Sequence, residues 1–271
     1  MSGWDEIGDR VFVRRYAFFD QNIGVVLGAG EALVIDTRST YAQAREIQTD
    51  LRDLTAAPVT VVVDTHGHFD HAYGNSLFRP ATIWGHERCV TFMARTGETR
   101  KAAIAAEVPE IADELAEIVI DPPDRTFAET AFVDVGGRRV ELRHLGRGHT
   151  DHDIVVRVPG AGVLFAGDLL ENGAVPYYGD GYPIDWPETA FRVAELVDAV
   201  VVPGHGDHAG RAFAETQAVS IGALAILARR VHAGELTLDD ALGQTPFPEH
   251  PSEAIRGPLQ RALAQLRNEL R

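Results

Sequence analysis

The sequence predicts an α/β protein in which two β-sheets pack face to face and helices cover the outside. Short apolar strands alternate with segments of helical spacing in the first half of the chain, and the same combination returns in the second half. Since a sheet buries one face against a second layer and amphipathic helices cover the other, this order favours a four-layer αββα sandwich. The 271 residues are enough to bury such a core.

The first half combines short strands with one well-defined helix. A glycine-rich turn at residues 28–30 separates two apolar runs and predicts a hairpin. Residues 40–54 carry apolar side chains at helical spacing, and the β-branched run 59–63 is typical of a buried strand. The polar segment 64–71 follows that strand directly, which is where layered α/β proteins place their chemistry.

A long helical pattern occupies residues 86–118. Its apolar stripe consists of Ile104, Val108, Ile111, Leu115 and Ile118. One interpretation is that the stripe packs on the core. The alternative is that residues 96–118 form a lid beside a substrate pocket, and the sequence leaves this choice open.

The second half returns to strands, with a helix before the last of them. The apolar runs are 131–135, 139–144, 153–158, 162–166 and 199–202, and the helix is expected near 188–197. The rest of the chain has a helical pattern, apart from residues 243–251. We therefore expect a catalytic domain over residues 1–210 and a C-terminal helical appendage, residues 211–271, packed on it.

The composition is that of a globular protein with a strongly acidic surface. Hydrophobic residues make up 45% of the chain, and the formal net charge is −15. Because such a surface repels phosphate groups and anionic lipids, we expect neither nucleic acid nor a membrane as a partner. The acidic N-terminus lacks a signal-peptide pattern and Cys89 is the only cysteine, so a cytoplasmic location is the simplest interpretation.

Four side chains that can ligate a metal ion are crowded into six residues. These are His66, His68, Asp70 and His71. Imidazole nitrogen and carboxylate oxygen are ligands that zinc prefers, but one short segment cannot complete two metal sites. His149, Asp168 and His205 each follow a predicted strand and adjoin a glycine, which lets the backbone approach a metal closely.

The order and spacing of these residues resemble the metallo-β-lactamase superfamily. Residues 65–75, Thr-His-Gly-His-Phe-Asp-His-Ala-Tyr-Gly-Asn, look like its T-H-x-H-x-D-H-x-x-G-N signature. Segments 148–150, 167–168 and 203–206 are similar to its later motifs, in the same order. The resemblance covers roughly residues 8–210 and implies a metallo-β-lactamase sandwich, similar to the glyoxalase II and lactonase branches with a bridging aspartate.

The resemblance also implies which side chains hold which metal. The first metal would be bound by His66, His68 and His149, the second by Asp70, His71 and His205, with Asp168 bridging both. Two Zn²⁺ ions are the expected cofactors, with iron and manganese as alternatives. Cys89 does not match the cysteine ligand of another branch of the superfamily.

A centre of this kind implies a dinuclear metallo-hydrolase. A water shared by two cations ~3.5–4 Å apart loses a proton near neutral pH and becomes the nucleophile, and Asp70 could orient it and accept its proton. We expect a small-molecule substrate: an ester, a lactone or a thioester. A β-lactam hydrolase, a mononuclear iron persulfide dioxygenase and a non-catalytic scaffold are the alternatives, and a homodimer through the C-terminal helices is left open.

An aromatic, glycine-rich segment at residues 172–186 follows the bridging aspartate, and such loops on a rigid scaffold often build pockets. The candidate substrate contacts in it are Tyr177, Tyr178, Tyr182 and Trp186. Ordinary loop packing is the alternative. His152 is expected either to support His149 from behind or to face solvent.

Overall fold

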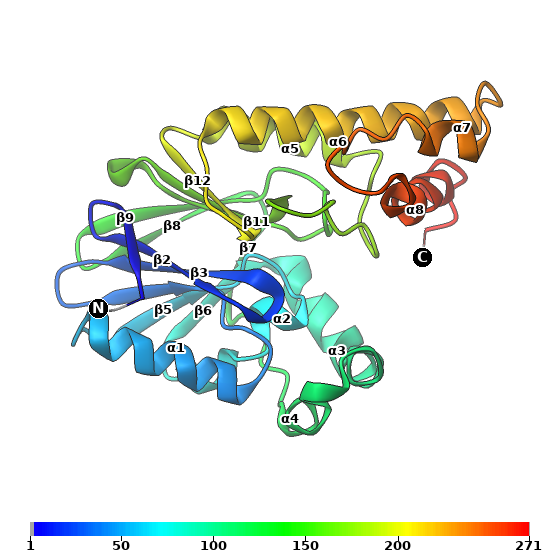
Figure 1. Ribbon diagram of the computed structural model, residues 1–271. Coiled ribbons are helices and arrows are strands. Elements are labelled where there is room, and N and C mark those ends of the chain that lie inside the picture. The colour runs from blue at the N-terminus through cyan, green and yellow to red at the C-terminus, as the bar shows by residue number, and fades with distance from the viewer. Residues whose placement is uncertain (1–2, 271) are drawn as a thin grey trace.

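The computed structural model describes residues 3–270, which form two packed β-sheets with helices on both outer sides (Figure 1). The first sheet contains β1 (Asp5–Gly8), β2 (Val11–Tyr16), β3 (Gln21–Leu27), β4 (Ala32–Ile35), β5 (Val59–Val63), β6 (Thr82–His86) and β7 (Arg125–Phe127). The second contains β8 (Thr130–Val135), β9 (Arg138–Arg143), β10 (Val155–Val158), β11 (Val163–Glu171) and β12 (Val200–His205). The predicted αββα architecture is confirmed.

The two sheets are joined through β3 and β12, where Gln21 pairs with His205. β3 is antiparallel to both β4 and β12, while β4 is parallel to β5 and β11 is parallel to β12. β4, β5, β11 and β12 therefore run in the same direction. Their carboxyl ends open at one end of the sandwich, and this brings the polar residues that end or follow these strands together.

The space between the sheets is filled by β-branched and other apolar side chains. Val26, Leu33 and Val63 of the first sheet meet Val156 and Phe165 of the second. Valine packs well on a pleated surface, which explains why valine-rich runs form these strands. The result is a rigid, dry scaffold beneath the polar end of the sandwich.

The predicted helix over residues 40–54 is confirmed as α1 (Tyr41–Leu54), which covers the outer face of the first sheet (Figure 1). Its N-terminus is capped by Thr40, whose Oγ1 accepts a hydrogen bond from the backbone of the first turn. The residues buried on its inner side are Ala44, Ile47 and Leu51.

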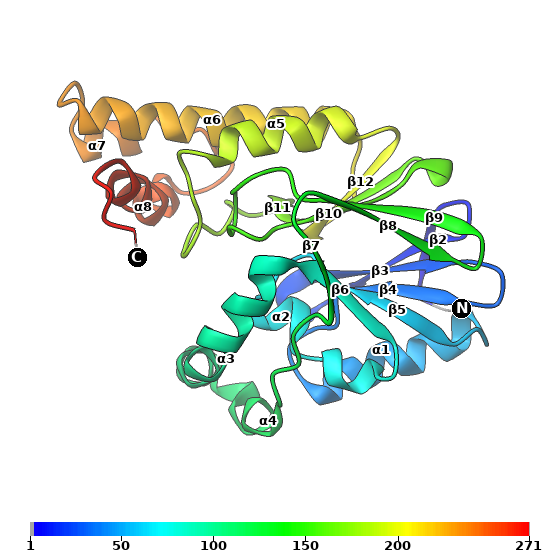
Figure 2. The ribbon, with the colours of Figure 1, turned by 180° about the vertical axis from the view of Figure 1, so that it is seen from behind.

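The helical pattern over residues 86–118 forms α3 (Glu87–Glu107) and α4 (Ala112–Glu117). The helix is interrupted at Val108 because Pro109 has no N–H group to donate and disfavours helical geometry in the residue before it. Both helices extend beyond the sheets at the end of the sandwich where the parallel strands finish (Figures 1 and 2).

The apolar stripe on these helices is divided between two environments. Ile111, Leu115 and Ile118 are buried in a cluster with the side chain of Met93. Ile104, also mostly buried, borders a cavity described below. The stripe thus both packs on the core and contributes to a pocket wall, while a lid motion of this region stays a prediction.

β11 is longer than the predicted run 162–166, and Asp168 lies inside the strand rather than after it. The register shifts between Phe165 and Gly167, and Gly167 has a left-handed φ of +53° that few other residues tolerate. The strand then continues by pairing Glu171 with β12. A glycine bulge ends an apolar run without ending the strand, and the hydrophobic pattern cannot show this.

The C-terminal helices are α5 (Trp186–Leu196), α6 (Arg211–His232), α7 (Leu238–Leu242) and α8 (Arg256–Leu266). α5 and α6 lie side by side over the second sheet and share its outer core (Figure 2). α7 and α8 pack against the C-terminal part of α6. The domain division at residue 210 falls just before α6 and stays a prediction. None of the helices within residues 3–270 has the length and apolar character needed to span a bilayer.

We predict that His86 makes the fold sensitive to acid. Its buried imidazole accepts a hydrogen bond from Arg88 N (3.2 Å) and faces the carbonyl oxygen of Ala128 (3.0 Å), so both nitrogens are satisfied in the neutral form. Burial and the neighbouring His144 lower the pKa of His86 to about 4. Because the unfolded chain binds the proton more tightly, His86 contributes stability above pH ~6.5 that is lost as the pH falls towards 4.

The measurement is urea denaturation of the wild type and of His86→Asn at pH 7 and pH 4.5. Asparagine can still cap α3 but does not titrate. The loss of unfolding free energy between the two pH values should be smaller in His86→Asn. An equal loss in both proteins would contradict the prediction.

Candidate metal centre

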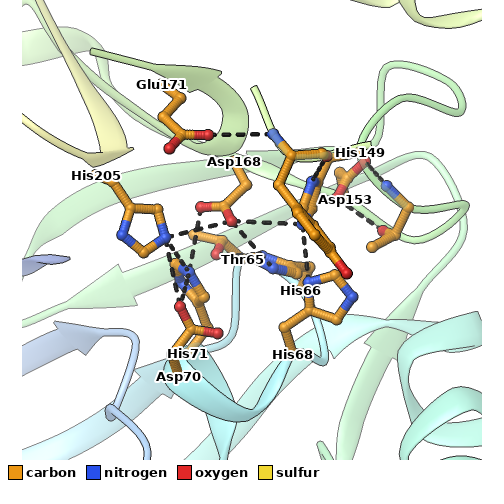
Figure 3. Close-up of polar contacts among 12 residues, drawn as sticks. Thr65, His66, His68, Asp70, His71, His149, Asp153, Asp168, Glu171 and His205 are labelled. Atoms are coloured by element: carbon orange, nitrogen blue, oxygen red, sulfur yellow. Dashed lines mark hydrogen bonds and ion pairs between the residues drawn. The ribbon is translucent and has the colours of Figure 1, made fainter. Parts of the chain in front are cut away.

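Two groups of metal-ligating side chains lie next to each other at the open end of the sandwich (Figure 3). The first group is His66, His68, His149 and Asp168, and the second is Asp70, His71 and His205. Within each group the ligand atoms lie within 4.8 Å of one another. The structure thus brings together all seven residues expected from the sequence.

The polar segment after β5 supplies four of these side chains within six residues. His66 and His68 lie in the irregular segment between β5 and the short helix α2 (Phe69–Ala72), and α2 carries Asp70 and His71. Figure 3 shows the first pair and the second pair reaching the two sides of the centre. The abrupt change from extended to helical backbone at His68 separates the pairs.

Asp168 lies between the two groups. Its Oδ2 is 3.4 Å from His149 Nε2 and 3.4 Å from His205 Nε2. The same oxygen is 3.7 Å from His66 Nε2, and Oδ1 is 3.2 Å from His71 Nε2. One carboxylate therefore faces imidazoles of both groups, the arrangement that a bridging ligand requires.

Gly204 allows this approach. A Cβ atom at that position would lie 1.8 Å from Asp168 Oδ1, so any side chain would displace the carboxylate. The glycine in the segment 203–206 therefore has a steric role at the centre, in addition to shaping the turn after β12.

The outward-facing nitrogen of every histidine in the two groups has a polar neighbour. His66 Nδ1 lies 3.2 Å from Thr65 Oγ1, His68 Nε2 3.1 Å from Asp180 Oδ2, His149 Nδ1 2.9 Å from Tyr177 O, His71 Nδ1 2.8 Å from Asp36 Oδ2 and His205 Nδ1 2.6 Å from Phe19 O. Such contacts fix ring orientation and leave the other nitrogen free for a metal.

The inward-facing atoms fit a cation. His66 Nε2 is buried and has no hydrogen-bond partner, while His149 Nε2 lies 2.8 Å from His68 Nδ1. Buried nitrogens facing one another beside a carboxylate are poorly satisfied without a proton or a metal between them. Three imidazole nitrogens and a carboxylate oxygen form a donor set that zinc accepts.

The electrostatics differ between the two groups. Burial lowers the pKa of His66 and of His149, which keeps these imidazoles neutral and ready to bind a metal. Burial also acts on His71 and His205, but the charges of Asp168 and Asp70 outweigh it and raise both pKa values well above the ordinary value. A cation entering the second group must therefore displace protons.

The two carboxylates of the centre stay ionised. Burial alone would raise the pKa of Asp168, but the charges of His71, His205 and other imidazoles hold it well below its usual range. The pKa of Asp70 is lowered in the same way by His71 and His205. Both side chains are therefore acceptors only, as metal ligands must be.

A cavity of about 390 Å³ opens onto the centre. Five of the seven metal-ligating side chains border it, and its other walls are mainly apolar. The remaining lining residues are Phe19, Phe69, Arg100, Ala103, Ile104, Glu107, Val108, Glu171 and Tyr177. A polar floor and apolar walls are typical of a site for a small ligand.

The four aromatic residues proposed as substrate contacts fall in different environments. Tyr177 borders the cavity. Tyr178 and Trp186 do not border it, because they pack on each other (ring centroids 4.7 Å apart) in the core beneath α5. Tyr182 lies outside the cavity lining too, under the guanidinium of Arg147. The packing of these three residues is that of an ordinary loop and core, and their role as substrate contacts stays a prediction.

His152 does not support His149. It is buried, and its Nδ1 lies 2.8 Å from Asp151 Oδ1, while the outer nitrogen of His149 faces the carbonyl of Tyr177. The sequence suggested this role only from the three-residue spacing.

Three carboxylates near the centre were not predicted. Asp36 follows β4 and receives hydrogen bonds from Thr65 N (2.8 Å) and Thr65 Oγ1 (2.9 Å) as well as contacting His71. Asp180 contacts both His68 and Arg100. Glu171 borders the cavity, where burial and then the charge of Asp168 raise its pKa to about 7.

The chain belongs to the metallo-beta-lactamase superfamily, because the model of that family matches residues 16–205. Curated relatives include Metallo-beta-lactamase type 2 of Bacteroides fragilis, 23% identical over 217 residues, which are 76% of this chain and 79% of the relative. Acyl-coenzyme A thioesterase MBLAC2 of Bos taurus is 26% identical over 224 residues, 73% of this chain and 79% of the relative. The chain is thus a member of a superfamily of metallo-hydrolases, with a His/Asp metal site.

Solved structures share the fold. A metallo-beta-lactamase from Pontibacter korlensis superposes with a TM-score of 0.64 at 22% identity and covers 81% of this chain and 98% of its own. A double mutant of a sec-alkyl sulfatase superposes with a TM-score of 0.78 at 14% identity, covering 99% of this chain and 50% of its own. At these identities the likeness concerns the fold alone. The second comparison extends it to the C-terminal helices.

We predict that Asp36→Asn weakens metal binding at the second group. The amide cannot accept hydrogen bonds from Thr65 and His71 at both positions, so the His71 ring loses its fixed orientation. Loss of such an outer partner typically costs about 10–100-fold in metal affinity. Competition with a chromophoric chelator measures the affinity. Asp134→Asn, in the exposed β8–β9 hairpin, is the matched control and should bind like the wild type.

Proposed function

We propose that this protein is a dinuclear, zinc-dependent hydrolase of a small-molecule ester, lactone or thioester. The observation that carries the proposal is the shared carboxylate of Asp168, which faces imidazoles of two adjoining metal-ligating groups at the floor of an apolar-walled cavity. When bound, two divalent cations supply a nucleophilic water of lowered pKa and polarise the scissile carbonyl.

The side chains of the chain have separate parts in this reaction. Asp168 and the histidines hold the centre, and Asp70, which is buried 3.4 Å from His205 Nε2, borders the cavity, where its carboxylate can orient the attacking water. Phe69 and Ile104 exclude bulk water from one side of the cavity, which strengthens the electrostatic interactions inside. The apolar walls favour a substrate with a hydrocarbon acyl part or ring.

The cavity size supports a small substrate. A volume of about 390 Å³ lies near the lower end of the ~300–1,000 Å³ range of ligand pockets. One curated relative is an acyl-coenzyme A thioesterase, which makes thioesters the first class to test. Relatives named as metallo-beta-lactamases make β-lactams the second class.

Two further alternatives are less well supported. A mononuclear iron dioxygenase needs one metal site, whereas the described residues form a second ligand group beside the first. A non-catalytic scaffold would have no need for a complete ligand set that opens into a cavity. The cytoplasmic location and a homodimer stay predictions.

We predict that His68→Ala and Asp168→Ala lower both metal content and turnover. His68→Ala removes a ligand of the first group, and Asp168→Ala removes the one shared by both groups. We expect a loss of turnover larger than the ~10–100-fold typical of outer partners. Elemental mass spectrometry should find about two zinc ions per chain in the wild type and fewer in both variants. His232→Ala, an exposed histidine at the end of α6, is the control. Full activity of metal-stripped protein would refute the proposal.

We predict that Val108→Trp distinguishes substrates by the size of the acyl group. Val108 borders the cavity and belongs to neither metal-ligating group, so the larger ring should fill space without changing metal content. KM for long-chain thioesters should rise by at least ~10-fold, since a single methylene in an apolar pocket is worth ~10–200-fold. Acetyl thioesters should be affected much less. A uniform change across chain lengths would mean that the acyl group does not occupy this cavity.

A further inference from the structure

The loop between β11 and α5, residues 172–185, contacts two of the three histidines of the first group. His149 Nδ1 lies 2.9 Å from the carbonyl oxygen of Tyr177, and His68 Nε2 lies 3.1 Å from Asp180 Oδ2. His66 faces Thr65 in its own segment instead. The loop therefore fixes the orientation of two rings that the first metal would need.

The loop is held in turn by α8. Arg261 donates from Nε to the carbonyl oxygen of Gly181 (2.9 Å) and from Nη2 to that of Asp180 (2.9 Å). Gln265, one helical turn further on, accepts from Ile184 N (2.8 Å) and donates to Asp185 Oδ2 (3.1 Å). Two side chains of one helix thus make four hydrogen bonds to four residues of the loop, all within residues 180–185.

The position of Asp180 is also fixed from the opposite side. Arg100 on α3 donates to Asp180 Oδ2, the same oxygen that faces His68. The carboxylate is held between α3 and the metal-ligating ring, while Arg261 holds its backbone. Displacing α8 would release the backbone of Asp180 and, through it, the contact with His68.

Among the described contacts, the imidazoles of the second group have no partner in the part of the loop that α8 holds; the loop meets this group at its first residue, where Asn172 N donates to the carbonyl oxygen of His205 (3.0 Å). His71 Nδ1 faces Asp36 directly after β4, and His205 Nδ1 faces the carbonyl oxygen of Phe19, before β3. Both partners belong to the sandwich. The family model ends at residue 205, so α8 lies outside the region that it describes.

We propose that α8 sets the affinity of the first metal site, with Arg261 and Gln265 acting as positioning residues through the loop at residues 172–185. The proposal rests on the metal centre of the proposed function but not on any substrate. According to this proposal, α8 acts on the metal centre through the loop. The two metal sites then differ in how their affinity depends on α8, since loss of the α8 contacts weakens only the first.

The test compares Arg261→Ala in two backgrounds of the full-length protein. Asp70→Ala impairs the second group and leaves the first to titrate, whereas His68→Ala impairs the first and leaves the second. Zn²⁺ affinity is measured by chelator competition in each. Arg261→Ala should weaken binding by about 10–100-fold in the Asp70→Ala background and by less than about threefold in the His68→Ala background.

Arg256→Ala is the matched control, because Arg256 lies on the same helix but contacts Glu253 and Asp239 at the surface. Arg261→Lys and Gln265→Ala are milder variants, should Arg261→Ala fail to fold by circular dichroism. In the Asp70→Ala background, the Arg261 variants should change the absorption spectrum of the Co²⁺-loaded protein. This spectrum depends on the geometry of the ligands around the Co²⁺ ion.

Equal weakening in both backgrounds would indicate a general structural role and overturn the proposal. Unchanged affinity in both would overturn it as well. If the His68→Ala background binds no metal at all, the dinuclear assignment fails, but the effect of Arg261 on the first group is still measured.

Discussion

The buried carboxylate of Asp168 is the constraint on which the rest of the centre depends. An ionised carboxylate removed from water is strongly destabilising unless charges or hydrogen bonds compensate. Imidazoles from three separate segments provide that compensation, and a divalent cation would replace the protons that they share. The left-handed Gly167 and the missing side chain at Gly204 are both needed for the carboxylate to reach this position.

The sandwich turns this constraint into a site. Because β4, β5, β11 and β12 run in the same direction, Asp36, the segment 65–71, Asp168 and His205 arrive at one end of a packed valine core. A rigid core holds side chains to the narrow tolerances that metal coordination and catalysis require. α3 and the loop before α5 lie outside this core and line the cavity.

The centre is connected to these surroundings by its outer hydrogen bonds. Asp36 links the second group to the first sheet, and Asp180 links the first group to α3 and, through its backbone, to α8. The metal-ligating groups are thereby connected to a cavity wall and to a C-terminal helix outside the region that the family model matches. In metal sites generally, such outer partners affect metal affinity as well as the ligands themselves.

The sequence by itself determined the αββα fold and the seven metal-ligating residues, since strands and helices follow from local periodicity and the ligands lie in short motifs with fixed spacing. It did not determine Asp36, Asp180 or Glu171, because an isolated carboxylate has no local signal and its role depends on what lies across the fold. The same reason explains why composition could not distinguish Tyr177, which borders the cavity, from Tyr178 and Trp186, which pack in the core. Only the tertiary structure decided which side of the loop faces the cavity, because that depends on packing between segments far apart in the chain.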